Sequence, residues 1–238
     1  MRVIEVSGQS GGQQNQVEHD DAIGPGADSD EHHLASRLRD TLAARHARQA
    51  AHAEDERLAD AQVTHAARKT GGKQAVTFMS SLLDDGWTMI RGYQNSSGGI
   101  GQLLLGTHGL VAMTSLHLDA TVHCRGDKWH AEKSDHRDGR PLGETQLVDQ
   151  AGRSPSTQLN QAADALEQFL RSCDVEISVA RVVLLTHPRS RVEESRRPAV
   201  QLFASPYDLA RWLKELPKVL DRGQRRKIEE LISGHASH

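Results

Sequence analysis

The 238-residue chain has few aromatic residues, with only three Phe, three Trp and two Tyr. None of the eight lies in residues 1–70. Aromatic side chains contribute much of the apolar area that a protein core buries. We therefore expect the main folding unit to lie in the later part of the chain, with about 150 residues, enough to bury roughly two-thirds of its unfolded surface.

Cysteines and long apolar runs are also scarce. Cys124 and Cys173 have neither CxxC spacing nor the density of a disulfide framework, so they are interpreted as small core residues in a reducing compartment. No stretch approaches the roughly 18 apolar residues of a membrane span, and the N-terminus lacks a signal-peptide core. These absences predict a cytoplasmic protein with no membrane partner.

Positive charge is not in excess, because the formal net charge is −3 at pH 7. Bulk electrostatics therefore give no sign of a nucleic-acid-binding protein. Any contact with nucleic acid would need a local basic patch.

The N-terminal part has the composition of non-globular segments. Residues 1–28 are rich in Gly, Gln, Ser and Asp and predict a disordered tail. Residues 30–68 are dominated by Ala and charged residues, with Leu34, Leu38 and Leu42 spaced four apart, which predicts a long polar helix. We interpret it mainly as a solvated helix, with a coiled-coil arm as the alternative.

Residues 72–215 alternate between helical and strand patterns. A helix ends at Asp84-Asp85-Gly86, and a polar loop runs from the second hairpin to Pro155. The predicted strands are 87–93, 100–105, 110–114, 120–124, 128–133, 182–185 and 199–204, and the later helices are 159–170, one that begins after Ser205, and 218–233. This order predicts an α/β fold with a mixed sheet flanked by helices.

Several short motifs occur in a fixed order through this region. They are Gly71-Gly72 before a helix, Asp84-Asp85-Gly86-Trp87 after it, residues 100–109 and 110–115, Gly126-Asp127-Lys128-Trp129, Gly152-Arg153-Ser154-Pro155 with 158–163, and residues 182–191. In order and spacing they resemble the nuclease-related domain (NERD) family.

The resemblance implies a restriction-endonuclease-like core. In such enzymes carboxylates at the ends of two adjacent strands hold a divalent cation, and a lysine positions or activates the attacking water. Mg²⁺ requires hard oxygen ligands in near-octahedral geometry. Cleavage of a phosphodiester needs that charge beside the attacked phosphate.

This sequence departs from the family at each catalytic position. Where the family has a Glu after the second glycine there is Lys73, and where it has Glu-Ile-Asp-His there is Gly99-Ile100-Gly101-Gln102. Thr114-Ser115-Leu116 replaces the Glu-x-Lys unit. We therefore expect no bound metal cofactor and a catalytically inactive module that binds nucleic acid or a protein partner.

Two alternatives remain open. His117, Asp119 and His123 share one parity, so a continuous strand would place them on one face as a displaced site for Mn²⁺, Zn²⁺ or Mg²⁺ in an active DNA nuclease. Surface histidines without a role are the simpler interpretation. The other alternative is a scaffold that self-associates through residues 30–68.

Five residues are candidates for contact with nucleic acid. Ser154 or Ser156 is expected to cap the helix that follows, with Gln158 in its first turn, and helix initiation is the favoured role of this segment. The alternative is that Gln158 faces the former active cleft, where a helix N-terminus favours anions such as phosphate. Arginine binds phosphate with two hydrogen bonds, which makes Arg153, Arg189 and Arg191 candidates as well.

The basic residues near these candidates also have a simpler interpretation. Residues 189–197 are predicted to form a loop between two strands, in which acidic neighbours neutralise part of the charge and the arginines are only solvated. Acidic partners likewise balance the basic residues of the last predicted helix.

Overall fold

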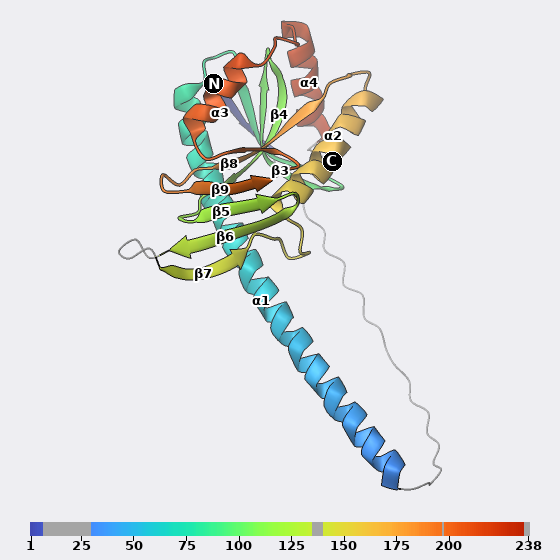
Figure 1. Cartoon of the computed structure of the whole chain (residues 1–238). Coiled ribbons are helices and arrows are strands. Elements are labelled where there is room, and N and C mark those ends of the chain that lie inside the picture. Colours follow the sequence, from blue (N-terminus) through green and yellow to red (C-terminus); the bar gives the residue numbers. More distant parts are fainter. Residues whose placement is uncertain (7–29, 135–139, 197, 236–238) are drawn as a thin grey trace. The chain divides into compact units, whose positions relative to one another are not determined.

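The computed structural model describes residues 1–6, 30–134, 140–196 and 198–235 (Figure 1). The chain divides into two compact units, one of residues 1–8 with 59–238 and the other of residues 9–58. Among the described helices none is both long and apolar enough to cross a membrane.

The centre of the larger unit is a six-stranded sheet with the order β1-β2-β3-β4-β8-β10. Its strands are β1 (Arg2–Glu5), β2 (Thr88–Asn95), β3 (Gly98–Gly106), β4 (Gly109–Leu116), β8 (Val179–Leu185) and β10 (Gln201–Phe203). Strands β2, β3 and β4 pair antiparallel, whereas β1–β2, β4–β8 and β8–β10 are parallel. The predicted α/β fold with a mixed sheet is therefore confirmed.

Helices cover both faces of this sheet (Figure 1). One face packs against α2 (Pro155–Ser172) and α4 (Arg222–His235). The other packs against the last turns of α1 (Asp30–Leu82) and against α3 (Pro206–Glu215). Apolar side chains alternate between the two cores along the strands: Leu103 and Leu105 belong to the first core, and Leu104 belongs to the second.

A second sheet has the order β7-β6-β5-β9. It contains β5 (Thr121–Arg125), β6 (Lys128–Ser134), β7 (Pro141–Gln146) and β9 (Arg191–Arg196). The β5–β6 hairpin was predicted, but the continuous polar loop before Pro155 and the arginine-rich loop at 189–197 were both wrong. Polar segments form β7 and β9 because each satisfies its backbone groups on a strand of the predicted hairpin.

The prediction of a disordered tail over 1–28 is wrong at its first residues. Strand β1 pairs in parallel with β2, with Arg2 opposite Thr88 and Glu5 opposite Arg91. The main chain continues this pairing on both sides of β1, because the amide of Arg2 donates to Trp87 O and that of Val6 to Arg91 O. The remainder of the predicted tail, residues 7–28, lies outside the described residues.

Helix α1 is continuous where the sequence predicted one helix at 30–68 and another after Gly71-Gly72. A side chain at Gly71 would place its Cβ 2.5 Å from the carbonyl oxygen of Ser115. One turn earlier the carbonyl of Ala67 accepts a 3.0 Å hydrogen bond from the amide of His117. The glycines therefore allow the main chain of α1 to approach the main chain at the end of β4, and this contact offsets their low helix propensity.

The last helix begins later than the predicted residue 218. The amide of Gln224 donates to Asp221 Oδ1 and the amide of Asp221 donates to Gln224 Oε1, which is a reciprocal capping box. In the smaller unit, side chains 41–58 of α1 are all exposed, including Leu42 and Leu58. Both the solvated helix and the coiled-coil arm predict this exposure in a single chain.

Candidate functional site

A cleft of about 500 Å³ lies where β2 ends, β3 begins and β4 ends. Helix α1 contributes its charged wall through His65, Arg68 and Lys69. Helix α2 contributes Gln158 from its first turn. The floor is formed by strand residues, which are Gly92, Gln94, Gly99, Ile100, Gly101, Gln102, Thr114 and Ser115.

The predicted degenerate positions gather in this cleft, with two exceptions. Gly99, Gly101, Gln102 and Thr114 line it. Leu116 is fully buried in the core. Lys73, on α1, is exposed and does not line the cleft.

The chemistry of the cleft is cationic. Arg68 and Lys69 are permanent cations, His65 adds charge when protonated, and no Asp or Glu is among the described residues that line it. The buried amide of Gln102 accepts a 3.1 Å hydrogen bond from Ser115 Oγ, so this position is occupied by a neutral pair. The cleft therefore has donors for an anion and lacks the carboxylates that a hard dication requires.

Arg68 is the most constrained of these cations. Its Nη1 donates to Gln158 Oε1, and Gln158 Nε2 in turn donates to the carbonyl of Arg153 at 2.7 Å. Its Nε and Nη2 are buried and have no hydrogen-bond partner among the described residues. Burial lowers the pKa of the Arg68 guanidinium, and the nearby charge of Asp149 opposes that shift.

The first turn of α2 is held by a buried network of side chains. Ser154 caps the helix, as predicted, with its Oγ accepting from the amide of Thr157. Ser156 Oγ accepts from Trp129 Nε1 and donates to Asp127 Oδ1, each at 2.9 Å. Two motifs of the sequence, at 126–129 and 152–155, thus meet in space and fix the turn that carries Gln158.

Ser156→Ala is expected to lower the free energy of unfolding by about 1–3 kcal/mol, because it leaves the buried indole N–H without an acceptor. The control is Ser172→Ala in the same helix, whose exposed hydroxyl donates to the carbonyl of Phe169 and lies 4.0 Å from Cys173 Sγ. Urea unfolding of both variants measures the difference. Equal midpoints would contradict a structural role for the network.

The predicted trio His117, Asp119 and His123 is split, because β4 ends at Leu116 and β5 begins only at Thr121. His117 lies 3.1 Å from Thr186 Oγ1, and its ring packs edge-on against that of His187. Burial, and then the charge of His187, lower the pKa of His117.

Asp119 stays near His117, because it lies 3.6 Å from His187 Nδ1, and it also pairs with Arg189. His123 is separate and faces Glu132 at 3.5 Å on the second sheet. The premise of a single strand face is therefore wrong. Within the described part of the chain no group of three or more His, Cys, Asp or Glu is placed to hold a metal ion.

The arginine candidates are likewise dispersed. Arg153 forms an ion pair with Asp149, with Nη2 at 2.9 Å from Oδ2. Arg189 pairs with Asp119, and Arg191 is exposed on β9. None of the three lines the cleft, and of the five predicted contact residues only Gln158 does.

Sequence reasoning missed the cations of α1. His65 and Arg68 lie in the segment interpreted as a solvated helix, where charged residues are ordinary, and Lys69 follows it directly. The signal that could have found Arg68 is Gly71, because residues three apart share a helix face and a glycine within a helix marks the side that is approached closely.

The fold and the cleft together define a mixed α/β domain with a cationic depression at the ends of its central strands, lined by no Asp or Glu in the described part of the chain. No protein-family model, curated protein or solved structure was found that matches the chain. The resemblance to the nuclease-related domain stays a prediction that rests on the motifs of the sequence.

Proposed function

We propose that this chain is a nuclease-related module that binds nucleic acid through its phosphate backbone and does not hydrolyse it by a metal-dependent route. The observation that carries the proposal is the cleft at the ends of β3 and β4, lined by Arg68 and Lys69 and by no described carboxylate. Phosphate contacts from Lys and Arg supply most of the affinity in sequence-independent binding.

The hydrogen-bonding groups of the cleft support a phosphate ligand. Lys69 is exposed and free to approach a backbone phosphate, and the side chains of Thr114 and Gln158 add neutral polar groups. No Phe, Trp or Tyr is among the described residues that line the cleft. These residues offer none of those three rings for a base to stack on, so we expect the affinity to come from phosphate contacts, which carry no sequence information.

The metal-dependent route is disfavoured by the same residues. A dication at the former active site would stand beside Arg68 and Lys69 with only neutral oxygens as ligands. Repulsion at close range and the lack of anionic ligands both lower its affinity.

Binding of a labelled DNA oligonucleotide at several salt concentrations tests the proposal. We expect a slope of about −2 in log affinity against log salt, because two permanent cations face the phosphates. Lys69→Gln is expected to make that slope shallower by about 1. Lys73→Gln is the matched control, since Lys73 lies on the same helix, is exposed and does not line the cleft.

Three results would contradict the proposal. They are no binding at low salt, equal effects of the two lysine variants, and cleavage of the oligonucleotide when Mg²⁺ or Mn²⁺ is added. The last result would revive the displaced-metal alternative and should then be repeated with His117→Ala.

A further inference from the structure

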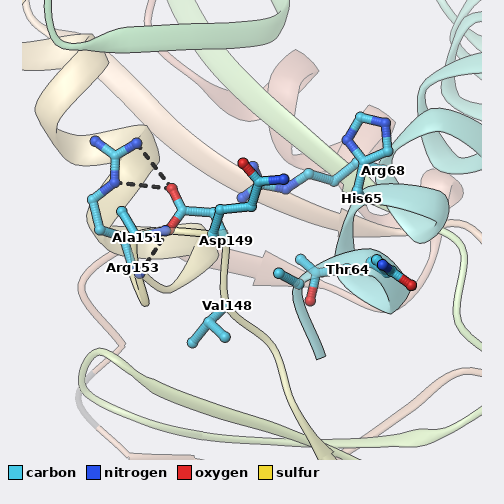
Figure 2. Close-up of a pocket in the computed structure, with 10 residues that line it drawn as sticks. Thr64, His65, Arg68, Val148, Asp149, Ala151 and Arg153 are labelled. Atoms are coloured by element: carbon cyan, nitrogen blue, oxygen red, sulfur yellow. Dashed lines mark hydrogen bonds and ion pairs between the residues drawn. The ribbon is translucent and has the colours of Figure 1, made fainter. Parts of the chain in front are cut away.

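Arg68 also lines a second cavity, of about 620 Å³ (Figure 2). We name it the side cavity. One wall is the segment of α1 from Ala61 to Arg68, and the other is the segment from Val148 to Arg153. Figure 2 shows His65 and Arg68 on the helix and Asp149 with Arg153 on the facing segment. His65 and Arg68 also line the cleft, so the two hollows share a wall.

The two unpartnered atoms of Arg68 lie on the same side of its guanidinium group. Nε and Nη2 lack hydrogen bonds among the described residues, and they are the pair of parallel donors that a guanidinium offers to two oxygens of one anion. Both atoms have less than 1 Å² of accessible surface, so the Arg68 side chain must turn toward the cavity to meet a ligand. An unsatisfied buried charged donor is costly, and this cost favours such a turn toward a partner.

The acidic residue opposite Arg68 does not serve as that partner. Asp149 Oδ1 accepts from the amides of Ala151 and Arg153, and Oδ2 accepts from Arg153 Nε. Its side chain also forms the ion pair with Arg153, and no ion pair between it and Arg68 within 4 Å is found among the described residues. The carboxylate is therefore hydrogen-bonded by its own loop and offsets the charge of Arg68 only at a distance.

The remaining lining suits an organic molecule better than a bare ion. Ala61 and Val148 are buried and give an apolar floor, while Gln62 and Gln150 place exposed amides at the rim. The volume falls in the range of small-molecule sites and leaves room beyond what an inorganic anion fills.

We propose that the side cavity binds a small organic anion, a phosphate monoester or a carboxylate of about mononucleotide size, whose two oxygens bond to the Nε–Nη2 edge of Arg68. Such a ligand neutralises a cation that the cleft also uses. Occupancy of the side cavity therefore weakens binding of nucleic acid in the cleft, and this coupling rests on the function proposed above.

Titration calorimetry of the full chain with AMP, succinate, inorganic phosphate and adenosine tests the site. We expect AMP or succinate to bind about tenfold more tightly than inorganic phosphate, and adenosine to bind more weakly than AMP. A response to AMP alone identifies a phosphate ligand, and a response to succinate alone identifies a carboxylate. Absence of binding by both at about 10 mM would overturn the proposal.

Substitution of tyrosine at two alanine positions tests where the anion binds. Ala151→Tyr fills the side cavity from its exposed rim and is expected to weaken binding of the anion at least about tenfold. Ala66→Tyr is the matched control, because Ala66 is exposed on the same helix as Arg68 and lines neither hollow. Equal binding by both variants would place the anion elsewhere and overturn the proposal.

The coupling between the side cavity and the cleft is measured as the change in DNA affinity when the anion is bound. A saturating concentration of the bound anion is expected to reduce DNA affinity in the unaltered chain and to have little effect in Ala151→Tyr. Binding of the anion without any DNA binding would contradict the proposed function but not the anion site in the side cavity. DNA binding with the expected salt slope, but no binding of AMP or succinate, would contradict the anion site but not the proposed function.

Discussion

Gly71→Ala is expected to lower the free energy of unfolding by about 3 kcal/mol, even though alanine is the better helix former. The added Cβ would lie 2.5 Å from the carbonyl oxygen of Ser115 and 2.8 Å from the amide nitrogen of Leu116. Both are main-chain atoms of β4, so no side-chain rotation relieves the contact. The helix or the strand must move, and the adjacent cores on both sides lose packing.

Urea unfolding measures this effect as a shift in midpoint at constant slope. Gly234→Ala is the control, because Gly234 is also helical and a Cβ there meets nothing within 4 Å. We expect the control to be neutral or slightly stabilising. A similar small change at both positions would mean that α1 does not approach β4 as closely as described.

Gly101→Glu is expected to reduce affinity for DNA by at least about tenfold at low salt, which corresponds to roughly 1.4 kcal/mol. Gly101 is exposed at the floor of the cleft, and the nearest atom to an added Cβ is Met113 O at 3.5 Å. The site therefore accommodates a side chain. A carboxylate there pairs with the cations of α1 and repels the incoming phosphate.

Gly101→Gln is the matched control for this substitution, because it has nearly the same shape and no charge. Oligonucleotide binding at two salt concentrations compares the variants. We expect the difference between Glu and Gln to shrink as salt rises, since screening weakens interactions between exposed charges. If Gln is as harmful as Glu at low salt, steric blockage and not charge is responsible.

Much of the fold follows from local patterns in the sequence. The β3–β4 hairpin has two apolar runs joined by Gly106-Thr107-His108-Gly109, and α2 has an apolar face that includes Leu159 and Leu166. Helix α3 begins where Ser205 caps it and Pro206 follows. Each signal lies within a few residues of the element it specifies, so it can be recognised without knowing which distant segment the element packs against.

The remaining strands depend on partners that are distant in the sequence. Strand β1 pairs with residues more than 80 positions away, and β9 pairs with β5 across about 70. Both are short edge strands, and β9 has a composition typical of loops. Their formation is decided by a neighbouring strand with free backbone groups, which a local pattern does not reveal.

The cleft was predictable only in part. The motif comparison led to Gly99, Gly101, Gln102, Thr114 and Gln158, all of which line the cleft. Arg68 was not predicted, because a charged residue in a polar helix is ordinary and Gly71 was not interpreted as the sign of a close approach on that helix face. Only the register of α1 against β4, which Gly71 and Ala67 set, turns that side chain inward.

The main-chain contact between α1 and the end of β4 also bears on how a ligand is received. The wall that carries Arg68 cannot swing outward without breaking the hydrogen bond at Ala67 and unpacking the core around it. A ligand thus encounters a preorganised surface and pays little entropy to order the backbone. We expect free and bound forms to differ by less than about 1 Å in this region, as in rigid docking rather than induced fit.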